Sequence, residues 1–249
     1  MSGDPEIPVP VPPPALPPAR VVLEPDAVHV WLASLESAGN EAVLPPADRE
    51  RAERTATATI RRRFVRGREL LRSVLASYTG TAPGDLVLDE TADGKPFLRG
   101  RPGDVRFNLT HTGDLWAVAV AAGREVGIDV ERTDRRVDVP AVSRRLFAAA
   151  EHEAIAALPD AEARTVFFRC WTAREAVVKA CGTGMMIPRV DFVVEAPPAR
   201  PLAIRSAGAD AFPWWVRELP APAGHVGALA VEGVPARVSS FVLRDTFAD

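Results

Sequence analysis

The sequence predicts an α+β fold with two similar subdomains, each built from helices and a small, mainly antiparallel sheet. Short apolar segments with strand-like alternation occur in both halves of the chain, separated by turn residues. Each half also contains longer segments with helical periodicity. The chain has 249 residues, of which 47% are hydrophobic and 25% charged, as is usual for a soluble globular protein of one large or two small domains.

The first subdomain is expected over residues 21–123. A first strand is predicted at Val28–Leu35, and two helices are predicted within Ala47–Tyr78, the first of them rich in arginine. The second helix should direct four apolar side chains inward: Leu70, Leu71, Val74 and Leu75. The helical pattern breaks at Gly80–Gly84. Further short strands are predicted at Leu86–Asp89, Pro96–Leu98, Arg106–Leu109 and Leu115–Ala121.

The second subdomain is expected over residues 124–249. Gly123 and Arg124 form a turn, and the strand Glu125–Arg132 opens this half. Helices are predicted at Val139–Phe147, Ala150–Leu158 and Glu162–Cys181. Strands are predicted at Asp191–Glu195, Trp214–Leu219, Val226–Val231 and Ser239–Leu243.

Residues 1–20 contain eight prolines and almost no periodicity, which predicts a disordered or polyproline-like arm. A proline-rich ligand for another protein is the functional alternative to an unselected tail. The arm lacks the basic start and continuous apolar stretch of a signal peptide. Because no run of eighteen apolar residues occurs either, we expect no membrane association.

Charge and cysteine content restrict the partners and the compartment. The formal net charge is only −3, which predicts no nucleic-acid partner, although Asp48–Arg72 holds nine arginines against four acidic residues. Cys170 and Cys181 have neither C-x-x-C spacing nor metal-type neighbours, so we expect reduced thiols in a cytoplasmic protein.

Three carboxylates and one ammonium carry the strongest chemical signal. Asp129 and Glu131 project from the same face of a strand, because strand side chains alternate. Glu175 and Lys179 lie one turn apart on one face of a helix. Together they predict an acidic, oxygen-only site, which suits Mg²⁺. Taken alone, Asp129 and Glu131 are more typical of a solvated strand face, and Glu175 with Lys179 of ion pairing along a helix.

A polar segment precedes this acidic strand. His111, Thr110 and Thr112 are expected at a strand exit, in a polar turn that leads into the next strand of a hairpin. An imidazole and two hydroxyls are suitable donors for phosphate oxygens, although a histidine alone is more often a turn residue than a ligand.

Three segments, taken in order, resemble the sequence motifs of 4′-phosphopantetheinyl transferases, in their surfactin-synthetase-activating (Sfp-type) branch. These are F-N-L-T-H-T-G from Phe107, V-G-I-D-V-E-R from Val126 and W-T-A-R-E-A-V-V-K from Trp171. The resemblance includes Gly94-Lys95-Pro96 upstream and covers about residues 28–245. The order and spacing of four motifs make it specific, whereas any one alone would be weak.

The resemblance implies a reaction and its partners. Such enzymes transfer the 4′-phosphopantetheine arm of coenzyme A to a serine of an apo acyl or peptidyl carrier protein, with Mg²⁺, and release adenosine 3′,5′-bisphosphate. It also implies that the two subdomains are related by a pseudo-twofold axis, with the active site at their interface. We expect a monomer.

Matching positions implies a role for each site residue. The Mg²⁺ ligands would be Asp129, Glu131 and Glu175, and Lys179 would approach the transferred phosphate. Coenzyme A would be contacted by Thr110 and His111 at its phosphates, by Lys95 near the nucleotide, and by Arg51 and Arg63 at the 3′-phosphate. The base that deprotonates the serine is either Glu151 or a metal-bound water.

Three positions depart from the family pattern. Arg174 stands where a lysine is usual and Thr110 where a serine is common, and both keep the relevant chemistry. Asp48 replaces a basic residue and is expected to weaken one coenzyme A phosphate contact. Carrier docking is expected beside the metal cleft, around Arg144–Glu153 and Gly182–Ile187.

Two other classes of function remain. A non-catalytic module that binds carrier proteins would keep a docking surface but lose the carboxylates, and this chain retains them. A nucleic-acid binder would use the arginines between residues 49 and 72, but it would need an interleaved aromatic stripe that is missing here.

Overall fold

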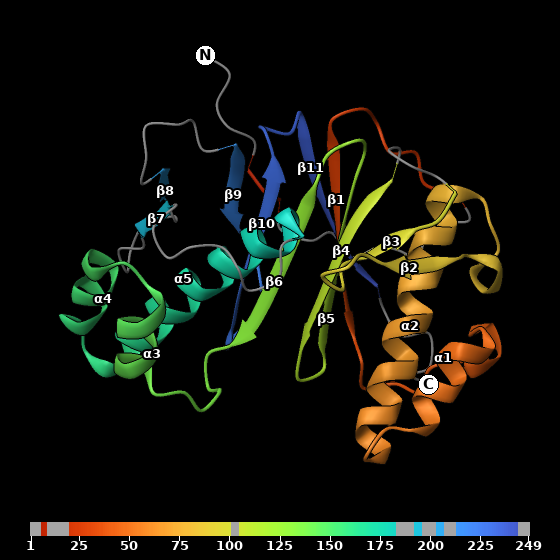
Figure 1. The fold of residues 1–249 in the computed structure, drawn as a ribbon, viewed down its shortest axis with the longest axis horizontal. Helices are drawn as coiled ribbons and strands as arrows, with labels where there is room; N and C mark the ends of the chain where they lie inside the picture. Colours follow the sequence, from red (N-terminus) through yellow and green to blue (C-terminus); the bar gives the residue numbers. More distant parts are fainter. Residues whose placement is uncertain are drawn as a thin grey trace.

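The computed structural model describes residues 6–8, 20–100, 105–182, 192–195, 203–206 and 213–243. The predicted α+β class is confirmed: two sheets stand next to each other in the centre of the molecule, with helices on both outer sides (Figure 1). No helix among these residues is long and apolar enough to cross a membrane.

The elements of the first half agree with the predicted order. They are β1 (Ala27–Ser34), a 3₁₀ turn (Glu41–Val43), α1 (Pro46–Glu53), α2 (Ala58–Thr79), a 3₁₀ turn (Pro83–Asp85), β2 (Leu88–Glu90), β3 (Pro96–Leu98), β4 (Arg106–Thr112) and β5 (Leu115–Ala121). Helix α2 begins where the Thr57 hydroxyl accepts a hydrogen bond from the Ile60 amide, and it ends at Gly80, whose φ is +69°. The four leucine and valine side chains predicted to point inward are buried.

The second half follows the same plan. Its elements are β6 (Val126–Arg132), α3 (Val139–Leu146), α4 (Ala149–Ala156), α5 (Asp160–Cys181), β7 (Phe192–Glu195), β8 (Ala203–Ser206), β9 (Trp214–Glu218), β10 (His225–Glu232) and β11 (Arg237–Leu243). Strand β8 and the 3₁₀ turn at Glu41–Val43 were not predicted from the sequence. Both are three or four residues long, too short to show a period.

The first and the last described strands, β1 and β11, are neighbours in one sheet. The first sheet has the order β11-β1-β5-β4, and the second has the order β6-β10-β9. Strand β11 runs parallel to β1, while the other neighbours in both sheets are antiparallel. The last described strand, β11, therefore returns to the sheet of the first half.

Strand alternation divides the core into layers. One face of β1 and β5 packs against the inner face of the second sheet, where Val126, Ile128 and Val130 are buried. The other face packs on α2 and contains Trp31 and Trp116. Burial of one such apolar side chain stabilises a fold by about 1.5–3 kcal/mol. These layers fix β4 and β6, the strands that carry the site.

Two predictions about the chain's periphery can be compared with the structure. Of the proline-rich arm, only residues 6–8 and 20 are described, and Ile7 packs against the apolar layer between the sheets. The rest of the predicted disordered arm lies outside the described residues. Cys170 is buried and Cys181 is half-buried, and both are free thiols as predicted.

Candidate active site

Strand β4 is longer than predicted, and this decides where three site residues point. We expected a polar turn at residues 110–114, but backbone pairing with β5 continues to Thr112. A two-residue turn suffices to reverse the chain in a hairpin. Because successive strand side chains alternate, Thr110 and Thr112 share one face while His111 lies on the other. The expectation of a polar turn at these residues is therefore wrong, because all three belong to a strand and their side chains lie on both of its faces.

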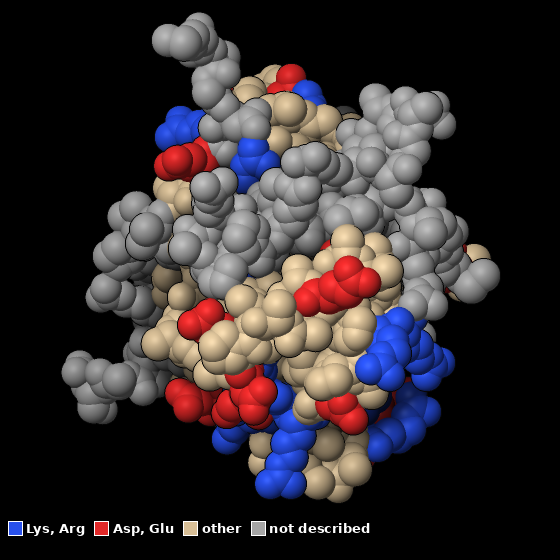
Figure 2. All heavy atoms as spheres, turned by 90° about the vertical axis from the view of Figure 1, so that its left-hand side faces the viewer, with Lys and Arg blue, Asp and Glu red and all other residues tan. Residues whose placement is uncertain are grey.

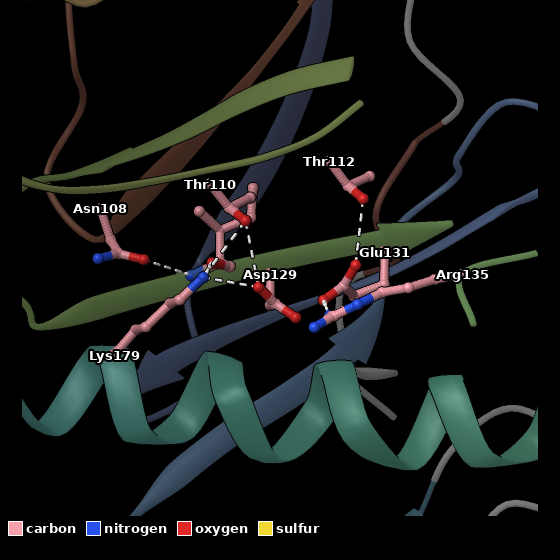
Figure 3. Close-up of polar contacts among 8 residues, drawn as sticks. Asn108, Thr110, Thr112, Asp129, Glu131, Arg135 and Lys179 are labelled. Atoms are coloured by element: carbon pink, nitrogen blue, oxygen red, sulfur yellow. Dashed lines mark hydrogen bonds and ion pairs between the residues drawn. The ribbon is translucent and has the colours of Figure 1, made fainter. Parts of the chain in front are cut away.

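The face of β4 that carries the two threonines is turned toward β6 (Figure 3). The Thr110 hydroxyl donates to Asp129 Oδ1 over 3.1 Å, and the Thr112 hydroxyl donates to Glu131 Oε2 over 3.1 Å. The two strands belong to different sheets, and Asn108 Oδ1 links them by accepting a backbone N–H of β6 over 3.0 Å. The equal spacing on both strands produces two matched hydrogen bonds.

Helix α5 lies close enough to β6 for Lys179 to reach Asp129. Gly127 permits this approach, since a Cβ there would stand 1.9 Å from the carbonyl oxygen of Ala176. Lys179 Nζ lies 2.6 Å from Asp129 Oδ1 and 3.3 Å from the Thr110 hydroxyl (Figure 3). A strand and a helix that are far apart in sequence thus present opposite charges to each other.

Burial dominates the electrostatics of this cluster. Asp129 is 5% exposed, and burial raises its pKa while the Lys179 ammonium opposes that rise. Burial also raises the pKa of Glu175, and the negative charge of Asp129 raises it further. The carboxylates therefore repel one another, and a bound cation would relieve that repulsion.

The oxygen atoms of this cluster determine how well it fits a metal ion. Within the described part of the chain, no three His, Cys, Asp or Glu side chains are arranged to hold a metal. Lys179 binds Asp129, and Arg135 binds Glu131 instead. However, Asp129 Oδ2 is buried and has no hydrogen-bond partner among the residues that the structure describes, which is costly unless a donor or cation meets it. The unpartnered oxygen and the oxygen-only donor set fit Mg²⁺.

On the other face of β4, a cavity of about 360 Å³ opens beside α2. Its lining includes Arg51, Arg63 and His111, three residues that the sequence assigned to coenzyme A. Burial lowers the pKa of His111, and the nearby Lys179 and Arg63 lower it further. The structure therefore brings these three predicted residues together in one cavity.

Acidic side chains already contact the cavity's arginines. Arg63 holds Asp114 with two hydrogen bonds of 2.8 Å, and the bonds from Arg63 lower the pKa of that carboxyl group. Arg51 lies 3.9 Å from Glu90, and both side chains are mostly exposed. A phosphate must compete with Asp114 for Arg63, whereas Arg51 is held only weakly.

The unusual acidic residue Asp48 has a structural explanation. Its carboxylate lies 3.0 Å from Arg72 and 3.5 Å from Arg68. Arg72 is 3% exposed and also donates to the carbonyl oxygens of Pro83 and Leu86. Because a buried guanidinium needs a counter-ion, Asp48 ties α1 to α2.

Lys95 lies apart from the arginine-lined cavity. Its ammonium is 2.6 Å from Glu125 and 2.8 Å from the carbonyl oxygen of Ala180, near the end of α5. Lys95 lines a second cavity, of about 490 Å³, whose wall shares Pro96 with the first. Its predicted contact with coenzyme A therefore stays a prediction.

Glu151 is buried at the start of α4. Its Oε2 atom accepts a hydrogen bond from the Ala148 amide over 2.6 Å and another from Arg174. Arg174 is the residue that stands where the family has lysine, so the substitution supplies a guanidinium partner for Glu151. The role of Glu151 as a base stays a prediction.

Sequence reasoning missed the counter-ions of the site. Arg135, Asp114 and Glu125 each neutralise a predicted site residue, but only Arg135 is a sequence neighbour of its partner. The contact of Thr112 with Glu131 could have been predicted, because Thr112 stands two residues after Thr110, as Glu131 does after Asp129.

Fold and site together define a class: two α+β halves that place a carboxylate–lysine cluster beside an arginine-lined cavity. Two family models match the chain, one for each half. Residues 31–123 match the N-terminal part of 4′-phosphopantetheinyl transferase, and residues 125–230 match the 4′-phosphopantetheinyl transferase superfamily.

Individual relatives agree. The chain is 34% identical over 224 residues to the 4′-phosphopantetheinyl transferase HetI of Nostoc sp., covering 87% of this chain and 92% of HetI. It is 26% identical over 151 residues to Sfp of Bacillus subtilis, covering 61% of this chain and 66% of Sfp. It is 31% identical over 137 residues to the 4′-phosphopantetheinyl transferase psf-1 of Bacillus pumilus, covering 55% of this chain and 57% of psf-1. The chain belongs to the 4′-phosphopantetheinyl transferase superfamily, in its Sfp-like branch.

Proposed function

We propose that this protein transfers the 4′-phosphopantetheine arm of coenzyme A to a serine of apo acyl or peptidyl carrier proteins, releasing adenosine 3′,5′-bisphosphate. The observation that carries the proposal is the Asp129–Lys179 pair, held between β6 and α5 beside the arginine-lined cavity. An ammonium and buried carboxylates beside a cationic cavity suit phosphoryl transfer, which depends on positioning and charge neutralisation.

Coenzyme A is proposed to bind across both faces of β4. Arg51 and Arg63 hold the 3′-phosphate, because guanidinium forks match phosphate geometry. His111 extends from the same cavity toward the pyrophosphate, and Thr110 faces it from the carboxylate side of the strand. Lys95 approaches the nucleotide only after leaving Glu125.

Asp129, Glu131 and Glu175 are the proposed Mg²⁺ ligands, and the ion would neutralise charge on the pyrophosphate. Lys179 then contacts the transferred phosphate, since its ammonium already lies within the cluster. Thr112 and Arg135 keep the Glu131 carboxylate in place on β6. Glu131 is the most exchangeable ligand, because water readily replaces one oxygen donor of Mg²⁺.

Glu151 is the proposed base for the carrier serine. Its Oε2 atom already accepts two hydrogen bonds, so it must release Arg174 or use its other oxygen to take a proton. The carrier protein would dock over α3 and α4, near Arg144–Glu153. Figure 2 views the molecule from the side of these helices and shows acidic and basic side chains interspersed there, without one continuous basic field. The second predicted docking segment lies outside the described residues after Gly182.

The decisive experiment mixes the protein with coenzyme A, Mg²⁺ and an apo carrier protein and measures the carrier's mass. A mass increase by one phosphopantetheine arm supports the proposal. Binding of the carrier without a mass change would support a non-catalytic docking module instead. We further propose a monomer that acts in the cytoplasm without nucleic-acid or membrane partners, and sedimentation of the purified protein tests the first of these points.

A further inference from the structure

The arginine-lined cavity contains a buried donor that no protein atom accepts. Trp116, on β5, lines the cavity and is 1% exposed, and its indole Nε1–H has no hydrogen-bond partner in the described protein. A buried N–H without an acceptor costs about 1–3 kcal/mol, so such a group calls for an explanation.

The neighbouring tryptophan of the same core layer behaves differently. Trp31 donates its indole N–H to the Tyr78 hydroxyl over 2.8 Å, deep between β1 and α2. Side chains of this layer can therefore supply a hydrogen-bond acceptor for a buried indole N–H. Trp116, which lines the cavity, has no such acceptor among the described residues.

Gly67 faces the unpartnered edge of Trp116. It lies inside α2, where glycine costs about 1 kcal/mol relative to alanine. Its backbone does not require glycine, since its φ is not among the positive values. A Cβ at this position would stand 3.6 Å from Trp116 Nε1, an ordinary contact that the fold tolerates. A methyl group would, however, fill the space next to the N–H.

The other residues that line the cavity indicate what kind of ligand it could bind. Arg51, Arg63 and Arg68 line it together with apolar side chains such as Leu35 and Leu109. Guanidiniums fit phosphate, apolar walls fit the faces of a flat ring, and a single N–H fits an acceptor on the ring edge. Of the two ends of coenzyme A, only the adenosine bisphosphate end combines a flat ring with a terminal phosphate.

We propose that Trp116 is a specificity-determining residue that donates its indole N–H to a ring nitrogen of the coenzyme A purine, in space kept open by Gly67. The proposal rests on the proposed function, because it assumes that coenzyme A occupies this cavity. It assigns base recognition to a residue outside all the motifs that identify the family.

Calorimetric titration with adenosine 3′,5′-bisphosphate, coenzyme A and 4′-phosphopantetheine tests this. Trp116→Phe keeps the aromatic ring and removes the donor, so it should weaken binding of the first two ligands about 3- to 10-fold, the usual value of one neutral hydrogen bond. Binding of 4′-phosphopantetheine, which lacks the nucleotide, should not change.

Gly67→Ala supplies a readout that a packing role would not give. Alanine should raise the melting temperature, because it favours the helix. It should nevertheless weaken the binding of adenosine 3′,5′-bisphosphate by a factor similar to that of Trp116→Phe. Trp215→Phe is the matched control, since this second tryptophan also has a buried, unpartnered indole N–H but lies in the layer between the sheets. It should leave nucleotide affinity unchanged.

The outcomes separate the two proposals. Unchanged affinity of both Trp116→Phe and Gly67→Ala for adenosine 3′,5′-bisphosphate overturns the role of Trp116, and a buried water would then account for its N–H. Equal losses for 4′-phosphopantetheine and the nucleotide also overturn it. If the wild-type protein binds neither coenzyme A nor adenosine 3′,5′-bisphosphate, the proposed function itself fails.

Discussion

The two charged regions on either side of β4 differ in how deeply their charges are buried. In the carboxylate cluster, the side chains of Asp129 and Lys179 are 7% and 28% exposed. In the arginine-lined cavity, those of Arg51 and Glu90 are 61% and 57% exposed. Exposed ion pairs contribute about 0–1 kcal/mol, whereas removing one partner of a buried pair costs several times more.

This difference suggests a division of labour. Charges in the cluster are weakly screened because little solvent separates them. They can therefore stabilise the charge that develops during a reaction. In the cavity, Arg51 is well screened by solvent, whereas Arg63 is 32% exposed and is held by the carboxylate of Asp114. Both guanidiniums can exchange one anion for another, so they suit reversible binding. We therefore expect variants of the cluster to alter the rate and variants of the cavity to alter affinity.

Asp129→Ala should have the largest effect, namely loss of transfer below detection in the carrier mass assay. The substitution removes the carboxylate with the unpartnered oxygen, and Lys179 keeps access to solvent, so the circular dichroism spectrum should stay that of a folded protein. Glu175→Ala should behave alike, while Glu131→Ala should be milder. Full activity of Asp129→Ala, or of wild type in excess EDTA, would refute the proposed metal site.

Lys179→Ala should lower kcat by about 10²-fold, the usual loss when one preorganised donor is removed from a reacting group. Coenzyme A affinity should change little, because the interaction is expected to strengthen as charge develops. Single-turnover rates at saturating coenzyme A, combined with calorimetric affinity, measure the two quantities separately. A collapse of affinity with a near wild-type rate would place Lys179 in ground-state binding.

Arg51→Ala and Arg63→Ala should raise KM for coenzyme A more than they lower kcat, by about 10-fold for loss of a charge-assisted contact. Dephospho-coenzyme A lacks the 3′-phosphate, so the penalty should shrink with this donor. Steady-state kinetics with both donors give the comparison. Equal penalties would assign these arginines to another part of the ligand and would break the proposed division between the regions.

The smallest effect concerns acid stability and a residue outside both regions. Burial, and then the charge of Arg237, lower the pKa of His29 from 6.5 to about 4. The unfolded chain binds a proton at this site below pH 6.5, but the folded protein does so only near pH 4, so this stability is lost as pH falls through that window. His29→Gln should lose less stability between those pH values in urea titrations. An identical pH profile would exclude His29 as a source of the acid sensitivity, and the raised pKa values of Asp129 and Glu175 could not supply it, because they stabilise the folded state as the pH falls.

Much of the local structure could be predicted from the sequence. The long helix at Asp160–Cys181 and the strand at Val126–Arg132 differ from their predictions by one or two residues, and glycines mark their limits: Gly182 follows the helix and Gly123 precedes the strand. Periodicity does not encode pairing between distant strands, so the contact of β11 with β1 was not foreseen. The end of β4 was misjudged because polar residues on a strand resemble a turn when hydrogen-bond partners from another sheet are unknown.

The candidate site shows the same limit. Motif residues could be placed on their elements, and three of the five assigned to coenzyme A meet in one cavity. The partners of Arg63 and Lys95 could not be predicted, since Asp114 and Glu125 lie 51 and 30 residues away from them in sequence. Such pairs follow from how the sheets meet, which no local pattern specifies.

The parallel pairing of β11 with β1 has a consequence for how the protein is made. Each residue from Ala27 to Ala33 pairs with one about 210 residues later, from Arg237 to Leu243. During synthesis, this edge of β1 therefore stays unpaired until residues 237–243 have emerged, and loop closure over this distance slows folding. We expect nascent chains that stop before β11 to remain bound to chaperones and to be degraded rapidly.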